Sequence, residues 1–541
     1  MAEHSSNTVL RLAEAITKSH SLIPSMPMAA QSPTLVKPDG SPLVLPSPST
    51  ISRVAAKTKG SMRNWNPLSI NGELQDMERR TIVDRSADLI SNDPNAAGVV
   101  ENLATTIVGT GLYPHPNFDP DSLGMSDDIA EKVKDQMMDV VKVWAPFADA
   151  GYRMSFSGCQ FLAQRQIVSH GEFLFLVVMD TEPARPYFLS VQAINPKRLK
   201  TPRDLSNKNN IIDGVEIGPR GKPIAYWIKR NEAGIQRIAD TKNNFVRISA
   251  RKGHRLKVLH GFPMNESEQF RGIPLFGPGM KFFRDLSDYL DAELVANVVT
   301  AAFAVFIETG GMSALTQAEK MATITETGYK SDGSTYDQRY EEIEPGMVLY
   351  GKQGEKPHPI SADRPGRTFD IFIRTILKSI ANSAGIPYPV LFRDFEGMNF
   401  ASYRSAMLEA WRVFKTRRKW LGEQFCAPLY RMLIEEAWLR DEIDVTDFYR
   451  DMFRLTSADW IGPPKGQIEP VKDIQADVMA VDNNFKALEE VLLESGREIR
   501  PTLKKIQAEK KAQKEMKIEP VKNQQVNADL EDKGESDNGS D

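Results

Sequence analysis

Residues 369–384 carry the most regular hydrophobic pattern in the chain, and this pattern restricts what the segment can fold into. Apolar side chains recur three and four positions apart: Phe369, Phe372, Ile373, Ile376, Leu377, Ile380 and Ala384. That spacing places them on one face of an α-helix. Polar residues stand four apart on another side: Asp370, Arg374, Lys378 and Asn382. We therefore predict an amphipathic helix that ends at Gly385-Ile-Pro387.

A second long helix is predicted upstream, over Met280–Ile307. It would be about 40 Å long at about 1.5 Å per residue. Its apolar end, Leu294–Ile307, is shorter than the ~20 residues that span a bilayer, so we expect a buried helix and no membrane contact. A mixed segment at 308–360 separates the two helices, with a strand expected at Met347–Tyr350.

A third long helix is predicted from Ala401 to Arg440, after a loop at Tyr388–Asn399. Pro428 should kink this helix because it removes one backbone hydrogen bond. The first half of the helix is basic, with a cluster at Lys415, Arg417, Arg418 and Lys419. A charged face or salt bridges between subunits explain this cluster better than contact with nucleic acid.

The part of the chain before residue 270 mixes both kinds of element. Helices are expected over Glu78–Asn92, ending before Asp93-Pro94, and then through Val100, Leu103 and Ile107. Strands are expected at Phe173–Met179 and Tyr187–Ile194, followed by a hairpin that pairs 215–217 with 224–228. The fold class is therefore α+β, with a β-rich middle third.

Charge and cysteine content narrow the class of protein. The 541 residues have a formal net charge of −4, which excludes a protein that holds nucleic acid by overall positive charge. Cys159 and Cys426 cannot build a disulfide framework, which fits a reducing, cytoplasmic setting, and Cys159 is expected to be a small core residue. Residues 1–60, rich in proline and serine at 21–50, predict a flexible arm, and 504–541 predict a disordered charged tail.

A search for catalytic motifs finds none. Gly272–Gly277 lacks the Lys-Ser/Thr of a phosphate-binding loop, and H-E-x-x-H, G-x-S-x-G and G-x-G-x-x-G patterns are absent from the sequence. The closest histidines, His254 and His260, suit neither a helix face nor a hairpin metal site. We therefore predict no catalytic residues, no metal and no cofactor.

The helices themselves leave two interpretations open. Two long helices around a small mixed module, then a sharp loop into a third, suit a subunit whose apolar faces pack against copies of itself. The alternative is a helical core within a monomer, which periodicity alone favours about two to one. Periodicity does not decide between them.

At these residues the sequence resembles the portal proteins of tailed bacteriophages, specifically the lambda-type group. The resemblance runs from about Asn64 to Gly496. It is carried by Arg85-Ser-Ala-Asp-Leu89, Asn92, Asn95, Val108-Gly-Thr-Gly-Leu112, Gly214-Val-Glu216, Pro223-Ile-Ala-Tyr-Trp227, His260, Arg271-Gly-Ile-Pro274, Asp288-Tyr-Leu-Asp-Ala-Glu-Leu294, Gly385-Ile-Pro387, Asp394-Phe395, Asn399-Phe-Ala-Ser-Tyr-Arg404, Trp460, Ile468-Glu-Pro470 and Lys472. Glu469-Pro470 and Lys472-Asp473 depart from the expected Asp-Pro and Lys-Glu, and both changes conserve charge.

The resemblance implies a portal-type fold assembled as a ring of about twelve subunits. The implied divisions are an N-terminal arm (1–60), a β-rich wing (61–276), a stem helix (277–307), a small α/β clip (308–362), a second stem helix (363–385), a tunnel loop (386–400), a long helix (401–440), a helical crown (441–503) and the charged tail (504–541).

The implied function is a channel at one capsid vertex, through which double-stranded DNA is packaged and ejected. The expected partners are further copies of the chain, the terminase large subunit, major capsid and scaffold proteins, and head-tail connector proteins, in a virion assembled in the host cytoplasm. A near-neutral subunit suits this role, because each phosphate neutralised by a fixed cation would oppose sliding.

Within the implied tunnel loop, four residues are candidates to face DNA: Arg393, Asp394, Glu396 and Asn399. Arg393 is the best phosphate partner; hydrogen bonds within the loop or between subunits are an equal alternative. Trp411 and Trp420 are expected to pack rather than to stack on bases. Two other functions stay open: an enzymatic packaging subunit, either nuclease or ATPase, and a head-completion protein without a channel.

Overall fold

The computed structural model describes residues 73–302, 305–308, 324–329, 335–340, 348–351 and 369–516, except 209, 231–239, 465, 467, 468 and 498. The predicted arm at 1–60 and the end of the predicted tail, 517–541, lie outside these residues. Among the described residues, no helix is both long and apolar enough to cross a membrane.

The first two described helices are α2 (Glu73–Asn92) and α3 (Pro94–Ile107), which confirms the predicted break at Asp93-Pro94. Asp93 caps α3 by accepting a hydrogen bond of 2.8 Å from the Ala96 amide, and Pro94 takes the first helical position, where its missing N–H costs nothing. After β1 (Tyr113–Pro116) come α4 (Pro120–Leu123), α5 (Asp127–Trp144) and α6 (Phe156–His170).

The middle third is β-rich, as predicted. One sheet has the order β10-β2-β3 and comprises β2 (Phe173–Met179), β3 (Leu189–Ala193) and β10 (Val258–Gly261). A second has the order β4-β5-β6-β7 and comprises β4 (Ile211–Ile212), β5 (Val215–Ile217), β6 (Pro223–Lys229) and β7 (Phe245–Ser249). The antiparallel pairing of β5 with β6 confirms the predicted hairpin. The short strands β8 (Arg251–Lys252) and β9 (Arg255–Leu256) form a further pair.

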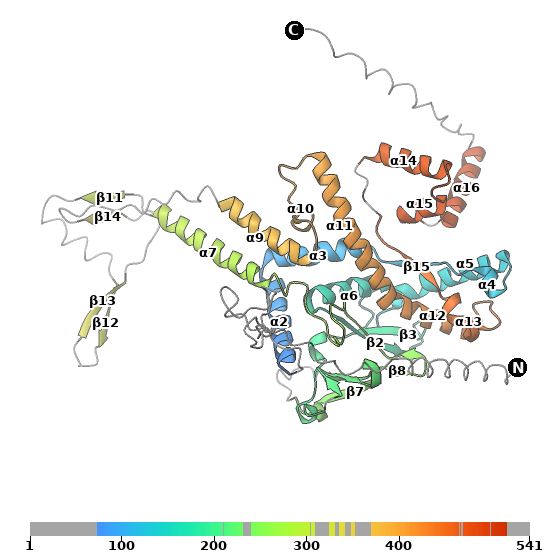
Figure 1. The fold of residues 1–541 in the computed structure, drawn as a ribbon, viewed down its shortest axis with the longest axis horizontal. Helices are drawn as coiled ribbons and strands as arrows, with labels where there is room; N and C mark the ends of the chain where they lie inside the picture. The colour runs from blue at the N-terminus through green and yellow to red at the C-terminus, as the bar shows by residue number, and fades with distance from the viewer. Residues whose placement is uncertain are drawn as a thin grey trace, which may run out of the picture. The chain divides into compact units, whose positions relative to one another are not determined.

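The largest hydrophobic core joins segments far apart in the sequence. It gathers α3, α5, α6, β2 and β3 around the C-terminal half of the long third helix (Figure 1). Phe425 lies at its centre, with its ring centroid 4.9 Å from that of Phe175 and 5.3 Å from that of Phe173. Cys159 and Cys426 are buried here as unpaired thiols, so the expected packing role of Cys159 is confirmed.

The predicted helix at Met280–Ile307 ends earlier than expected. Helix α7 covers Met280–Ala302, and Val305–Glu308 form strand β11, which pairs in parallel with β14 (Val348–Gly351). Val305, Phe306 and Ile307 are β-branched or aromatic, and the distant pairing partner favours the strand. Strand β14 was predicted, whereas β12 (Ile324–Tyr329) and β13 (Thr335–Tyr340) were not.

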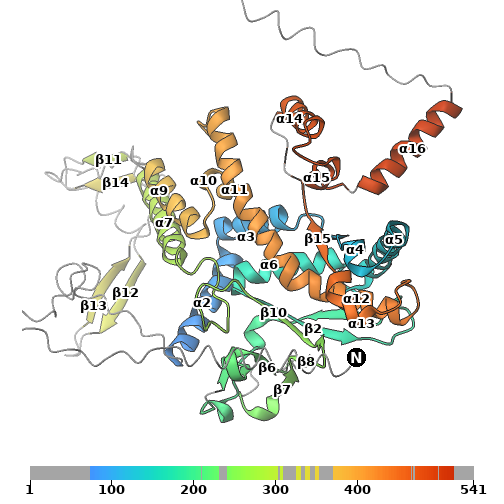
Figure 2. The same cartoon turned by 45° about the vertical axis from the view of Figure 1, so that its right-hand side comes forward.

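The amphipathic pattern at 369–384 is confirmed as α9 (Phe369–Ala384), which lies beside α7 in both views (Figures 1 and 2). The predicted loop at Tyr388–Asn399 contains a short helix, α10 (Tyr388–Phe392), which corrects that prediction. The third long helix is α11 (Phe400–Leu421), a π-helical turn (Gly422–Cys426) and α12 (Ala427–Leu439). The irregularity lies just before Pro428, which cannot donate to the carbonyl four residues back.

The C-terminal part adds α13 (Phe448–Leu455), β15 (Ala458–Ile461), α14 (Pro470–Asp482), α15 (Leu488–Glu494) and α16 (Ile499–Glu515). Strand β15 pairs with β1. The prediction of disorder from residue 504 is wrong as far as residue 515. Alanine, glutamine, lysine and glutamate between 504 and 515 are strong helix formers, which compensates for the charge density.

Candidate functional site

Helices α7 and α9 pack against each other through aromatic side chains. The Tyr289 ring of α7 has its centroid 4.9 Å from that of Phe372 and 5.8 Å from that of Phe369, both on α9. Towards the core, Ile376 and Ile380 are buried. The predicted apolar stripe of α9 therefore divides into a half that packs on the core and a half that packs on α7.

Much of the apolar surface of this helix pair is uncovered in the single chain. Leu294 is 64% exposed, Val295 is 61% exposed and Ile371 is 65% exposed. Leu290, Leu294 and Val298 follow one another at four-residue intervals along α7, and all three are exposed. The expected burial of Leu294–Ile307 is therefore wrong for Leu294, Val295 and Val298, which are 64%, 61% and 52% exposed.

The polar stripe of α9 and the predicted tunnel loop meet at Arg374. Its Nη2 atom donates to Glu396 at 2.7 Å and its Nε atom to Asp370 at 3.1 Å, while Asp394 lies 4.0 Å from Nε. Tyr388 donates its hydroxyl hydrogen to Asp394. One guanidinium thus ties a helix to the loop that follows it.

This network shifts the pKa values of Tyr388 and Asp394, the two groups joined by that hydrogen bond. Partial burial and the bond to Asp394 raise the pKa of Tyr388 to about 12. The same bond, reinforced by the Glu396 amide and the Arg374 charge, lowers the pKa of Asp394. Asp394 is therefore a carboxylate at neutral pH, and Tyr388 stays protonated as its donor.

The other predicted site residues are placed differently. Asn399 caps α11 by accepting a hydrogen bond of 2.8 Å from the Ser402 amide, so its oxygen has a structural partner. Arg393 is exposed and adopts a left-handed backbone conformation at the end of α10. Lys378 and Asn382 are also exposed. Within the described ranges, these three side chains have no hydrogen-bond or ion-pair partner.

The base of the loop is anchored to the core. Asn102 of α3 is buried, and its Nδ2 atom donates to the carbonyl oxygens of Val390 at 2.9 Å and Leu391 at 3.0 Å. Both carbonyls belong to α10. Helix α10 is therefore held on the core, and Arg393 is the first residue after it.

Comparison with known proteins assigns this arrangement to a family. Residues 58–418 match the family described as phage portal protein, lambda family, and that range is more than half of the chain. The chain belongs to the lambda family of phage portal proteins. Portal proteins are structural, non-enzymatic components of the virion, so the alternative of a nuclease or ATPase is set aside.

Two relatives and two solved structures place this portal protein among its neighbours. Portal protein B of Escherichia phage lambda is 22% identical over 467 residues, covering 81% of this chain and 85% of that protein. The portal protein of Escherichia phage N15 is 23% identical over 473 residues, with the same coverage. The chain also resembles the neck of the native GTA particle, computed with C12 symmetry, with a TM-score of 0.39 and 14% identity over 80% of this chain and 96% of that one. It resembles the neck of the empty GTA particle, computed with C6 symmetry, with a TM-score of 0.41 and 13% identity over 79% of this chain and 99% of that one. TM-scores this low add nothing to the assignment.

The basic cluster of this portal protein is largely occupied within the chain. Arg417 donates to the Ala384 carbonyl at 2.7 Å, and Arg418 donates to the carbonyls of Thr106, Ile107 and Pro463. Burial lowers the pKa of Arg418 to about 10. Trp411 and Trp420 pack against the core, as predicted. Arg417 and Arg418 thus hold α11 in place.

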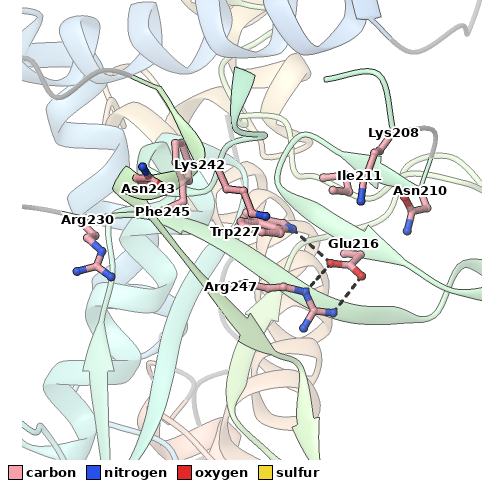
Figure 3. A pocket seen from close by; sticks show the side chains of 10 residues that line it. All are labelled: Lys208, Asn210, Ile211, Glu216, Trp227, Arg230, Lys242, Asn243, Phe245 and Arg247. Carbon is pink, nitrogen blue, oxygen red and sulfur yellow. Dashed lines mark hydrogen bonds and ion pairs between the residues drawn. The ribbon is translucent and has the colours of Figure 1, made fainter. Parts of the chain in front are cut away.

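A polar concavity of about 770 Å³ lies on the four-stranded sheet (Figure 3). Glu216 on its wall is fully engaged: Arg247 donates to it through two nitrogens at 2.8 and 3.0 Å, and the Trp227 indole at 3.3 Å. Lys208, Arg230 and Lys242 lie at its exposed edge. The one carboxylate in this lining already has donors, which makes the concavity a poor catalytic site.

The sequence predicted that His254 and His260 do not form a metal site, and the structure shows what each of them contacts. His254 pairs with Glu435 at 2.8 Å, and His260 pairs with the buried Glu172 at 3.0 Å. In the described ranges, no group of three or more histidine, cysteine, aspartate or glutamate side chains is arranged to hold a metal ion.

Sequence reasoning missed Tyr388 and Tyr289. Tyr388 lies within a segment predicted as a loop, where no periodicity shows which side chain it will meet. Tyr289 stands inside the resemblance segment 288–294, but its contact with α9 joins residues about eighty positions apart, and only folding brings these together.

Proposed function

We propose that this portal protein assembles into a closed ring of about twelve copies around an axial channel that carries double-stranded DNA during packaging and ejection. The observation that carries the proposal is the uncovered apolar side of α7 and α9. Fully burying one side chain such as Leu294 gains about 1.5–3 kcal/mol, so several such residues per subunit favour packing against a neighbour.

In this proposal α7 and α9 are the stem, and β11 to β14 belong to the clip. The first half of the predicted wing is mainly helical, from α2 to α6, and the second half holds the two sheets. Helices α11 and α12 form the long helix, and α13 to α15 belong to the crown. Residues 386–400 form the tunnel loop, with α10 at its base.

The proposed tunnel loop offers one cation, Arg393, and two anions, Asp394 and Glu396, to a passing duplex. Arg393 would contact phosphate; its exposure and its place directly after α10 support this role. Asp394 and Glu396 lie beside it: the hydrogen bond from Tyr388 lowers the pKa of Asp394, and Glu396 accepts a hydrogen bond of 2.7 Å from Arg374. A loop of nearly balanced charge lets DNA slide, because few counterions are released at any one position.

The proposed partners follow from the position at a capsid vertex. The clip would meet the terminase large subunit during packaging and head-tail connector proteins afterwards. The wing would contact major capsid and scaffold proteins. The chain itself supplies no phosphate-binding loop, so the energy for translocation would come from the terminase.

Electron microscopy of the purified protein tests the proposal. We expect closed rings with an axial opening wide enough for a duplex. Rings without an opening would favour a head-completion protein without a channel. A protein that stays monomeric at high concentration in every buffer would contradict the proposed assembly.

A further inference from the structure

Helices α14, α15 and α16 do not enclose a hydrophobic core of their own. None of their described side chains is buried. Large apolar side chains are exposed instead: Val471, Ile474, Val478, Met479, Phe485, Leu488, Leu503 and Ile506. Helices of this length gain most of their stability from packing an apolar face, and an exposed apolar surface of this kind is typical of an interaction site.

A groove between α14 and α15 gathers part of that surface. Its volume is about 920 Å³, and its apolar wall is formed by Ile474, Val478, Val481, Leu488 and Val491. Its acidic side chains, Asp473, Asp477, Asp482 and Glu494, outnumber its basic ones, Lys486 and Arg497. Lys486 lies between Asp477 at 3.6 Å and Glu494 at 2.7 Å, and Arg404 lies 3.8 Å from Asp473, so Asp482 is the groove carboxylate without an ion pair to a described residue. The groove therefore suits a helix that is apolar on one side and basic beside it.

Helix α16 has that character. It carries Leu503, 48% exposed, and Ile506, 39% exposed, among many lysines. Arg500 pairs with Glu131 and Lys504 with Asp135 at 3.2 Å, both on α5. The later lysines, 505, 510, 511 and 514, form no ion pair with any described residue.

The chain's own α16 does not fill the groove. The described residues that line it belong to 464–497, and none comes from α16. The ion pairs of Arg500 and Lys504 hold this helix on α5 of its own chain. The acidic end of the chain, 523–541 with net charge −5, is repelled by the acidic groove.

We propose that the groove between α14 and α15 receives α16 of a neighbouring copy of the same chain. Leu503 and Ile506 of the neighbour would enter between Val478 and Val491, and its lysines would face Asp477 and Asp482. This inference rests on the proposed ring, and it assigns α16 as the element that joins each subunit to the next at the C-terminal end.

Disulfide cross-linking of two single variants tests this contact. Val478→Cys and Ile506→Cys are co-expressed, purified as assembled protein and oxidised mildly. We expect a covalent pair of chains on a non-reducing gel. The yield of this pair should be at least five times the yield from either variant alone. It should also be at least five times the yield from Val478→Cys co-expressed with Phe453→Cys, a control at an exposed residue on α13. The native cysteines are buried and should not react.

Two results would overturn the inference. One is the absence of a covalent pair in rings that are intact by electron microscopy, which would leave the proposed function standing. The other result uses the Val478→Cys/Ile506→Cys double variant. A disulfide within one chain of this variant, together with no covalent pair of chains from the two co-expressed single variants, would show that α16 contacts the groove of its own chain.

Amide hydrogen exchange of the unmodified protein is an independent test of the proposed contact. Assembly should slow amide exchange in α14, α15 and α16 together, and reversing the charge of Lys505 and Lys510 should reduce that protection severalfold. The same change at Lys252, exposed on β8, should leave it unchanged. Equal exchange before and after ring formation would contradict the proposal, whereas failure to form any ring would contradict the proposed function.

Discussion

Glu172 shows how single residues fix the junction between α2 and the sheets. Its carboxylate is completely buried, and it accepts hydrogen bonds from Arg271, from the Gly272 amide at 3.0 Å and from His260 at 3.0 Å. Arg271 also lies 3.1 Å from Asp213, to which Arg79 and Arg80 of α2 donate. Arg271 and His260, both part of the portal resemblance, thus have a structural role in this buried cluster.

Replacing Glu172 with glutamine should destabilise the protein by about 3 kcal/mol, because Arg271 would lose one of its two buried counter-charges and keep only Asp213. Urea unfolding at pH 7 measures this. The matched control is Glu78→Gln, which is exposed on α2 and should change stability by less than about 0.5 kcal/mol.

The same carboxylate predicts a pH dependence. Burial alone would raise the pKa of Glu172, but the Arg271 charge and the bonds from His260 and Arg271 outweigh it and hold the pKa well below its usual value. The stabilisation is therefore complete above about pH 4.3, the ordinary value, and is lost as the pH falls towards the folded-state pKa. Melting temperatures of the unmodified protein and Glu172→Gln should converge between pH 7 and pH 3. A constant difference would contradict this account.

Replacing Arg374 with alanine should release the tunnel loop from α9. We expect amide exchange at 394–399 to rise severalfold. The loss of global stability should be small, because the ion pairs lie at the surface and are screened by solvent. Lys378→Ala, one turn along the same stripe and without a described partner, is the control. Equal exchange in both variants would show that Arg374 does not restrain the loop.

At the scale of elements, the end of α9 decides where the proposed stem meets the proposed tunnel loop. Gly385 ends α9 with a φ of +69°, a conformation that side chains with a Cβ rarely adopt. Ile386 follows and is buried, so the chain turns sharply from the helix into α10. The glycine therefore sets the direction in which the tunnel loop leaves the stem.

Two glycine-to-alanine changes should have opposite signs. At both Gly385 and Gly98 an added Cβ would meet no atom within 4 Å, so only backbone conformation differs. Gly385→Ala should cost about 1–2 kcal/mol, because its φ is left-handed. Gly98→Ala, inside α3, should gain about 0.5–1 kcal/mol. Chemical denaturation measures the free energy of unfolding of both variants. A loss of stability in both would contradict the conformational explanation.

At the scale of the whole molecule, large apolar side chains of the described residues are exposed on α7 and α9, the proposed stem helices, and on the C-terminal helices α14 to α16. Its net charge of −4 produces little repulsion between copies. Both features favour association of subunits over tight binding of DNA. The uncovered surfaces belong to helices that pack only partly on their own core, as expected of a subunit that completes its packing in an assembly.

Placing glutamate at Leu294 should prevent ring formation without unfolding the subunit. The residue is 64% exposed, so the free energy of unfolding should stay within about 0.5 kcal/mol, while burial of the new charge opposes assembly. Sedimentation velocity should show monomers for Leu294→Glu and rings for the control Met77→Glu, which is 71% exposed on α2. Intact rings of Leu294→Glu would exclude this side of α7 from the interface.

The sequence by itself determined the local elements. The stripe at 369–384, the break at Asp93-Pro94 and the strand Phe173–Met179 were all predictable, because periodicity, capping and turn chemistry depend on residues close together in the chain. The resemblance of short motifs in a fixed order indicated the family instead. It also found the loop residues Asp394 and Glu396, but not the groups they would meet.

Only the tertiary structure decided which of these groups meet. Arg374 with Glu396, Glu172 with Arg271, and β11 with β14 join segments that chain folding brings together, and no local pattern encodes such a pairing. The apolar side of α7 was predicted to be buried, yet its own chain leaves Leu294 exposed. An apolar run has the same sequence whether its partner is the chain's own core or another copy, so burial is a property of the fold and the assembly.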